Sequence, residues 1–354
     1  MIPLLEKFIK DRHIEKSTAK GYQTVIKQYT EFHETPINDL ILEAWNDETE
    51  TPQMYKRRLP SRIHEFRESL LGLGTLEAGT INNKITKLQT FYTHYGVEFP
   101  DIKGIKSKKK QITYFDLPNI EHIQMALDST SIQNQAIILF LASSETGKSE
   151  AANITILDFI EATNEYHDGG TLEEILDQLY SVQEPLVPTF ALMRQKTLKQ
   201  YYTFCTPEAS FAIIRWLKHR LKIAKNKNEK VHLNEPLFGT NARGIGDKLN
   251  KINDKLGFGF KGKYRFLRPH TLRKFHASNI GLSEEHIDML QGRSKDSVHD
   301  TYIKSNPKHL KQIYMNAMEN VTINLENQRT VVNEEYNIHL HLHFHDESGL
   351  TTHI

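Results

Sequence analysis

A histidine and an arginine lie three positions apart in the segment His270-Thr-Leu-Arg273-Lys-Phe of this 354-residue chain. Residues at that spacing share one face of a helix, so both side chains can reach the same ligand. An arginine fork matches two oxygens of a phosphate, and a histidine can carry a proton. A tyrosine from a following segment, Tyr302, could then attack the phosphorus and become covalently attached. These residues therefore predict phosphoryl transfer to a tyrosine, with no metal or other cofactor.

The spacing of these residues resembles the C-terminal catalytic boxes of the tyrosine recombinases (phage integrases), in particular those of archaea and archaeal viruses. Tyr302 lies nine positions after Arg293, the separation found in that family between its Gly-His box and its nucleophile. The resemblance implies that Arg273 holds a DNA phosphate, His270 assists proton movement, and Tyr302 forms a 3′-phosphotyrosyl link. Arg293 replaces the box histidine and is expected to donate to a phosphate oxygen.

The family also uses a lysine as general acid, on a hairpin between two strands. Strands are predicted at 187–193 and 201–205, and the resemblance places the acid at Lys196, with Lys199 as the runner-up. A lysine can protonate the leaving 5′ oxygen if its pKa is lowered or if the proton is shared in the transition state. Arg194, at the start of the same turn, is expected to bind a backbone phosphate, and Lys199 is also expected to contact the DNA.

The first arginine of the family pattern is missing. The apolar helix, the small-residue turn and the Ser-Glu pair are present between Leu141 and Glu150, but the register puts Gly147 or Lys148 at the arginine position. A lysine offers a point charge and no fork. Losing one bidentate contact could cost roughly 2–4 kcal/mol in the transition state, by comparison with an oxyanion donor. Either Lys148 substitutes with reduced activity, or the chain binds and synapses DNA but cuts slowly or not at all.

Two other enzyme classes remain as alternatives. A type IB topoisomerase would use the same residues as a relaxing monomer. Residues 142–149 also match a relaxed phosphate-binding loop, in which Lys148 would bind ATP phosphates. That loop has no internal glycine to help its amides wrap a phosphate, and no alternating strand–helix series follows it. The ATPase is therefore the more distant alternative.

Composition limits the class of protein. Apolar residues make up 38% of the chain and charged residues 25%, with a net charge of +1. No apolar run approaches the roughly 20 residues of a membrane helix, and the chain is expected to be cytoplasmic. The single cysteine, Cys205, excludes an internal disulfide and is expected to be a buried structural thiol. Lysine and arginine are absent from Ser149 to Met193 and frequent from Arg194 to Arg273, which predicts one acidic and one basic face.

Helical spacing of apolar residues predominates, so the expected fold is mainly α with a small antiparallel β-sheet in the catalytic domain. The resemblance implies a two-domain clamp on double-stranded DNA, which acts as a tetramer to integrate or excise a viral or other mobile genome. The expected parts are a helical core-binding domain (1–102), a basic linker (103–112), a catalytic domain (113–325) and a C-terminal tail (326–354).

Basic residues of the linker, and of the segment before the His270 helix, are expected to contact the DNA backbone. They are Lys106, Lys108, Lys109, Lys110, Lys263, Arg265 and Arg268. Residues 257–262 are expected to form a flexible approach to that helix, and His276 to be an ordinary surface or helix-face histidine. In the tail, His339, His341, His343 and His345 alternate with apolar residues. This pattern predicts a strand that docks on a neighbouring protomer, with a metal site as the alternative.

Overall fold

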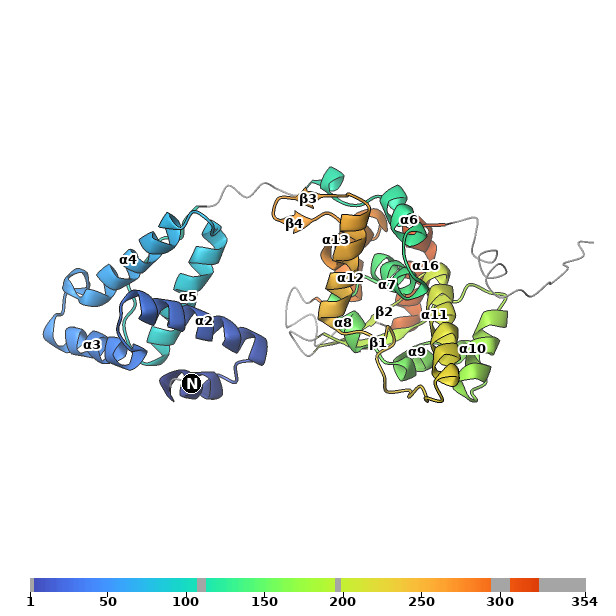
Figure 1. Ribbon diagram of the computed structural model, residues 1–354, viewed down its shortest axis with the longest axis horizontal. Coiled ribbons are helices and arrows are strands. Elements are labelled where there is room, and N and C mark those ends of the chain that lie inside the picture. The colour runs from blue at the N-terminus through green and yellow to red at the C-terminus, as the bar shows by residue number, and fades with distance from the viewer. Residues whose placement is uncertain (1–2, 107–112, 195–198, 294–305, 325–354) are drawn as a thin grey trace, which may run out of the picture. The chain divides into compact units, whose positions relative to one another are not determined.

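The chain forms two compact units, which are described separately (Figure 1). The computed structural model describes residues 3–106, 113–194, 199–293 and 306–324. The first unit ends at Gln111 and the second begins at Ile112. That division falls at the end of the lysine-rich segment that was expected to be a linker.

The first unit consists of helices whose apolar faces share one core. Tyr29 lies at the centre of this core and meets the rings of Phe66 and Tyr92 edge to face. Helix α2 has Glu15 at its N-terminal capping position, and the Glu15 side chain makes no capping hydrogen bond. The elements are α1 (Pro3–Asp11), α2 (Lys16–Phe32), α3 (Ile37–Glu50), η1 (Met54–Lys56), α4 (Arg58–Gly72) and α5 (Ala78–His94).

The second unit is also mainly helical and has two small antiparallel hairpins. Its elements are η2 (Tyr114–Asp116), α6 (Ile120–Asp128), α7 (Ile132–Ser143), α8 (Lys148–Asn153), α9 (Ile156–Ala162), η3 (Asn164–Tyr166), α10 (Leu172–Ser181), β1 (Phe190–Met193), β2 (Gln200–Thr203), α11 (Pro207–Asn226), α12 (Ala242–Lys255), β3 (Phe260–Lys261), β4 (Tyr264–Arg265), α13 (Pro269–Asn279), α14 (Glu284–Leu290), α16 (Pro307–Ala317) and η4 (Met318–Val321).

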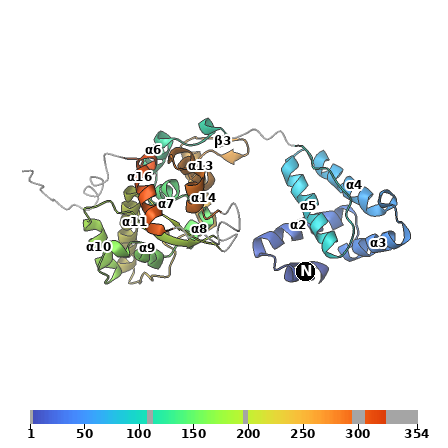
Figure 2. The same ribbon diagram turned by 180° about the vertical axis from the view of Figure 1, so that it is seen from behind.

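Helix α7 forms the centre of this unit, between α11 and α13 (Figures 1 and 2). Every residue from Ala136 to Ser143 is buried. A helix that is apolar on all sides must be enclosed by other elements, because no face of it can be left in water. The central position of α7 fixes the turn that follows it, where the first arginine was expected.

The β1–β2 hairpin pairs Phe190 with Thr203 and Met193 with Gln200. Burial alternates along β1, as expected for a strand with one face on a core. Both predicted strands are confirmed, although β1 begins at Phe190, three residues later than expected. Cys205 follows β2 and is fully buried, which raises the pKa of its thiol to about 12. The thiol is therefore structural, as predicted.

One prediction for the segment before α13 is wrong, and one alternative for a residue within α13 is excluded. Residues 257–262 do not form an irregular approach, since Phe260 and Lys261 pair with Arg265 and Tyr264 as the β3–β4 hairpin. Of the two positions expected for His276, the surface one is excluded, because this residue of α13 is completely buried. Its ring stacks on Tyr314, with 6.3 Å between ring centroids and 10° between planes.

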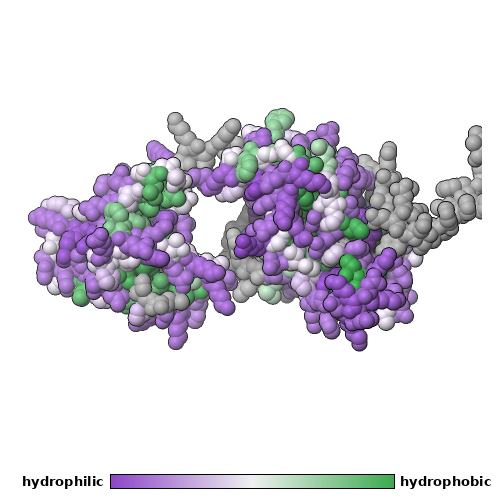
Figure 3. All heavy atoms as spheres, in the orientation of Figure 1, coloured by the Kyte–Doolittle hydropathy of each residue, from purple (hydrophilic) through white to green (hydrophobic). Residues whose placement is uncertain are grey.

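Hydrophilic residues dominate the face seen in Figure 3, and apolar residues there form small separate patches. Among the described residues, no helix is both long enough and apolar enough to cross a bilayer. The same part of the chain contains no cluster of three or more histidine, cysteine or acidic residues suited to a metal ion. The four tail histidines lie outside the described residues.

Candidate active site

Helix α13 carries both His270 and Arg273. Pro269 occupies its first turn, where a missing N–H costs nothing, and the hydroxyl of Thr271 accepts a hydrogen bond from the Arg268 N–H at 3.0 Å. Leu272 and Phe275 are buried and form the side of α13 that packs on the core. His270 and Arg273 are less buried and lie at the edge of that core, which leaves both side chains available to a ligand.

The guanidinium of Arg273 is partly buried, and this desolvation lowers its pKa. Its Nη2 donates to Oε1 of Gln291 at 2.9 Å. The nearby carboxylates of Glu145 and Glu150 favour the charged form. An arginine stays protonated even in such surroundings. A partly desolvated cation attracts an anion more strongly than an exposed one, because less water screens the charge.

Several cations surround His270. Its own desolvation lowers the pKa of the imidazole, and the charges of Arg268, Lys274, Arg273 and Arg293 lower it further. The imidazole is therefore neutral at physiological pH and can donate one proton or accept another. Five basic side chains near one another make this edge of the unit a strong site for an anion.

The turn after α7 brings a glycine next to Arg273. A Cβ added to Gly147 would lie 3.4 Å from Nη1 of Arg273. Lys148 is the first residue of α8, and its side chain is exposed. Of the two registers considered for the missing arginine, the structure thus puts Gly147 beside Arg273. A role for Lys148 in the site stays a prediction.

The phosphate-binding-loop alternative is wrong. Such a loop must follow a strand, and the apolar run before it is helix α7. Both sheets among the described residues are two-stranded and antiparallel, so no parallel sheet supports a nucleotide site there.

The end of α14 closes the site from another side. Gly292 has a φ of 60°, and a Cβ there would lie 2.6 Å from the ring of Tyr201. Its carbonyl accepts a hydrogen bond from Nη1 of Arg194 at 3.1 Å. Arg293 follows with an exposed side chain whose Nη1 is 3.8 Å from Asp288. Arg194 and Arg293 thereby approach the site from the β1–β2 hairpin and from α14.

Three buried polar residues near Arg273 were not predicted from the sequence. Glu145, Gln291 and His276 are 0%, 3% and 0% exposed. His276 lies three positions after Arg273, the same spacing that drew attention to His270. That repeated spacing was the signal that could have found it. No pattern in the sequence points to Glu145 or Gln291.

The residues predicted to contact DNA differ in their surroundings. Lys106 is exposed. The ammonium of Lys263 lies 5.2 Å from the ring of Tyr264, and the guanidinium of Arg268 lies 4.6 Å from the same ring. Arg265 is paired with Asp254 through two bonds of 2.7 and 2.8 Å, so this pair must open before Arg265 could bind a phosphate with its fork.

Lys199 closes the β1–β2 hairpin, because its carbonyl accepts a bond of 2.8 Å from the Arg194 N–H. Outside the described residues lie Tyr302, Lys196, Lys108, Lys109 and Lys110.

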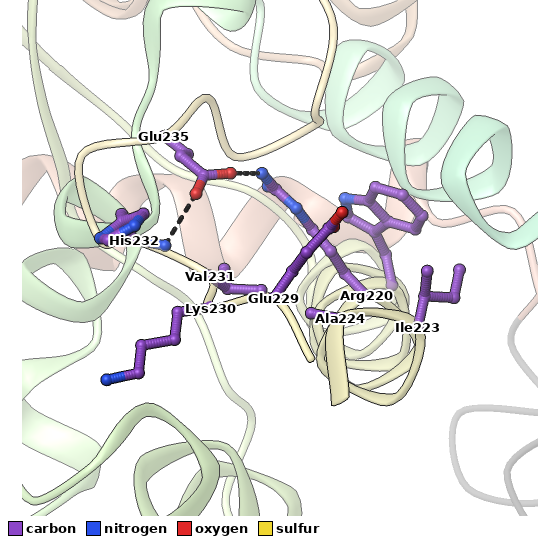
Figure 4. Close-up of a pocket in the computed structure, with 9 residues that line it drawn as sticks. Arg220, Ile223, Ala224, Glu229, Lys230, Val231, His232 and Glu235 are labelled. Carbon is purple, nitrogen blue, oxygen red and sulfur yellow. Dashed lines mark hydrogen bonds and ion pairs between the residues drawn. The ribbon is translucent and has the colours of Figure 1, made fainter. Parts of the chain in front are cut away.

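A separate pocket lies between the end of α11 and residues 229–235 (Figure 4). Arg220 and Glu235 pair across it, and Glu235 also accepts a bond of 2.8 Å from the His232 N–H. None of the predicted site residues lines this pocket. Two of its charged residues, Arg220 and Glu235, are paired with each other, and the α13 site remains the candidate functional centre.

Comparison with solved structures identifies the fold. A lambda integrase dimer bound to a COC′ core site matches with a TM-score of 0.50 and 13% identity, over 85% of this chain and 76% of that chain. This chain has the lambda integrase fold. The fold class predicted from the sequence, mainly helical with a small antiparallel sheet, is thereby confirmed. Neither protein-family models nor curated protein sequences match the chain.

Two further solved structures align with most of the chain at slightly lower TM-scores. A dimer of lambda integrase residues 75–356 on the same core site has a TM-score of 0.49 and 13% identity, over 86% of this chain and 98% of that chain. The XerH site-specific recombinase on a palindromic difH substrate has a TM-score of 0.48 and 16% identity, over 87% and 82%. At such identities the likeness concerns the fold, and residue roles depend on the site described above.

Proposed function

We propose that this chain is a tyrosine recombinase, which cuts and rejoins DNA at specific sites through a 3′-phosphotyrosyl intermediate. The observation that carries the proposal is the position of Arg273 and His270 at the edge of one core-anchored helix, beside Gly292-Arg293, in a chain with the lambda integrase fold. A cationic edge of this kind suits the negative charge that gathers on a phosphate under attack.

The proposed reaction transfers a phosphoryl group of the DNA backbone to Tyr302. The phenolic oxygen of Tyr302 passes its proton to the neutral imidazole of His270 and bonds to the phosphorus, and the bond from phosphorus to the 5′ oxygen breaks. Lys196 donates the proton that the leaving 5′ oxygen needs, and Arg273 and Arg293 neutralise the phosphate oxygens. The bond energy stays in the phosphotyrosine, so a 5′ hydroxyl from another duplex can reverse the step and join a new strand.

The proposed partner is double-stranded DNA. The lambda integrase structure with the matching fold is a dimer on core-site DNA, and the basic groups around His270 suit a polyanion. Exchange of one strand from each of two duplexes, followed by the other, requires four nucleophiles, so a tetramer is the proposed working form. Integration or excision of a viral or other mobile genome is the role we propose for this reaction.

A nicked suicide DNA that carries candidate sites tests the proposal. Cleavage releases a short strand that diffuses away, so the covalent intermediate accumulates. The proposal predicts a denaturation-resistant protein–DNA adduct that forms in the presence of a metal chelator and is absent in Tyr302→Phe. Tyr55→Phe is the matched control, because Tyr55 is an exposed tyrosine of the first unit, and it should give the wild-type yield.

The same preparation separates the alternatives. A catalytically weak homologue would bind the sites without an adduct. A type IB topoisomerase would form the adduct and relax plasmids that lack paired sites. Recombination only between paired sites supports the recombinase, and relaxation without them contradicts it.

A further inference from the structure

A buried polar chain connects the turn after α7 to Arg273. Nε2 of Gln291 donates to Oε1 of Glu145 at 2.7 Å, and Nη2 of Arg273 donates to Oε1 of Gln291 at 2.9 Å. Glu145 and Gln291 are almost completely excluded from solvent. Hydrogen bonds in such surroundings are not weakened by competing water, and losing one partner leaves the other unsatisfied.

The direction of these two bonds is fixed by chemistry. The carboxyl oxygen Oε1 of Glu145 accepts from Nε2 of Gln291, so the NH₂ group of Gln291 faces Glu145. The amide oxygen then faces Arg273, which can only donate. Glu145 thus determines which end of Gln291 the guanidinium meets. The contact takes one of the five donors of Arg273 and restrains the plane of its fork.

Glu145 itself is held in an unusual backbone conformation. Its φ is 57°, in the left-handed region that costs a side-chain-bearing residue roughly 1–2 kcal/mol. The turn is fixed on both sides, since the hydroxyls of Ser144 and Thr146 are 2.9 Å apart and Thr203 donates to the Ser144 carbonyl. Such strain persists only where the surroundings enforce it, and it gathers at functional sites.

Helix α13 contacts the same carboxylate a second time. Nδ1 of His276 lies 3.4 Å from Oε1 of Glu145, and both side chains are completely buried. His276 stacks on Tyr314, whose hydroxyl donates to the Ser143 carbonyl at 2.8 Å. Glu145 is therefore enclosed by α13, by α16 and by its own turn, and cannot follow Gln291 if that residue moves.

We propose that Glu145 and Gln291 are positioning residues for Arg273, which hold its guanidinium plane in the orientation that the scissile phosphate requires. The inference rests on the proposed function. Without an arginine beside it at position 147, Arg273 shares the phosphate only with Arg293, whose side chain is exposed. Its own orientation is then more important, because a bidentate contact fails when the fork is turned away.

The test compares cleavage and binding in the full-length chain. The variants are Gln291→Met, Arg273→Lys and their combination, and the readouts are the single-turnover rate of adduct formation and the Kd for the same DNA. Gln291→Met should slow adduct formation about 10- to 100-fold, since small misplacement of a catalytic group has effects of this size. The Kd should change less than about threefold, because most phosphate contacts are unaltered.

The double variant separates positioning from general damage. A lysine has no fork to orient, so Gln291→Met should slow the Arg273→Lys protein less than about threefold. Equal slowing in both backgrounds, or a wild-type rate for Gln291→Met, overturns the inference. If the Gln291→Met protein does not fold, Glu145→Gln takes its place in this comparison. Glu145→Gln keeps the shape of the side chain but allows the amide of Gln291 to rotate by 180°.

A matched control is available on α7. Oε1 of Gln135 also accepts a bond from an arginine, Nη2 of Arg215, at 2.6 Å. Gln135 precedes Ser143 by eight positions, about 12 Å along the helix at 1.5 Å per residue. Gln135→Met should therefore cleave at the wild-type rate.

A second readout does not depend on cleavage. In protein with ¹⁵N-labelled arginine, the Nε–H resonance of Arg273, assigned through Arg273→Lys, should be sharp in the wild type and broadened or shifted in Gln291→Met. If the wild type forms no adduct, the proposed function fails while this measurement still decides the positioning. If Gln291→Met leaves the Arg273 resonance unchanged, the inference is overturned, whether or not the protein cleaves DNA.

Discussion

Gly147 and Arg273 are near neighbours, because a Cβ built on Gly147 would lie 3.4 Å from Nη1 of Arg273. The φ and ψ of Gly147 are −77° and 159°, which any residue can adopt. The atom that a new side chain would displace is Oε2 of Glu150, the end of a flexible side chain. An arginine can therefore be accommodated here, next to the second arginine of the pattern.

Restoring that arginine should increase activity. Gly147→Arg should raise the single-turnover rate of adduct formation at least tenfold, because another fork beside Arg273 would share the phosphate charge, a contact worth roughly 2–4 kcal/mol in the transition state. Lys148→Arg serves as the comparison. It should also raise the yield if Lys148 substitutes for the arginine, but less, since residue 148 is exposed. A Gly147→Arg protein no faster than wild type would refute the assignment of position 147.

His270 should titrate below the usual histidine range. Its desolvation and its cationic neighbours both lower the imidazole pKa, so the Cε1–H resonance should give a midpoint below about 6.5. Lys274→Gln removes one cation and should move the midpoint upward. Adduct formation should fall as the pH drops through the same midpoint, because the protonated ring can no longer accept a proton. A midpoint above 6.5 would contradict this environment.

Gly292 should be difficult to replace. Gly292→Ala forces a side chain into a left-handed φ and toward the Tyr201 ring, 2.6 Å away. The free energy of unfolding should fall by about 2 kcal/mol or more, measured by chemical denaturation. The control is Gly246→Ala in α12, where a Cβ meets nothing within 4 Å. This change should stabilise the protein by about 0.5–1 kcal/mol, as expected in a helix interior.

Glu208 should make stability depend on pH. Burial raises the pKa of this carboxyl to about 7, and the carboxylate accepts a bond of 3.0 Å from the Ile323 N–H. Since the folded pKa of Glu208 exceeds the unfolded value, this group's contribution to stability is greatest below about pH 4.5 and is lost as the pH rises through about 7. Glu208→Gln should remove this fall and be more stable than wild type at pH 8, by on the order of 1–3 kcal/mol. Parallel pH profiles for the two proteins would be the contrary result.

Local patterns were sufficient to predict much of the fold. The spacing of His270 and Arg273 indicated a helix, and α13 is confirmed over Pro269–Asn279. The β3–β4 hairpin was missed because each of its strands has only two residues, too few to show alternation. The short helix α8 was missed for a similar reason, since six residues hold too little of a periodic pattern.

The partners of Arg273 could not be predicted in the same way. Glu145 and Gln291 are 146 positions apart in the sequence, and each looks like an ordinary polar residue of a turn or a helix end. Their burial follows from the packing of α7, α13 and α14, which brings separate segments together. The burial of His276 was not predicted for the same reason, because a histidine on a short helix gives no sign of which face will be covered.

The most direct test of the account is to identify the residue that becomes joined to DNA. The adduct from the nicked substrate is digested with trypsin and nuclease, and the modified peptide is sequenced by mass spectrometry. Residues 296–304 form a predicted tryptic peptide in which Tyr302 is the sole tyrosine. The account predicts a nucleotide on Tyr302 of that peptide. A nucleotide on any other residue, or an adduct that survives in Tyr302→Phe, would contradict it.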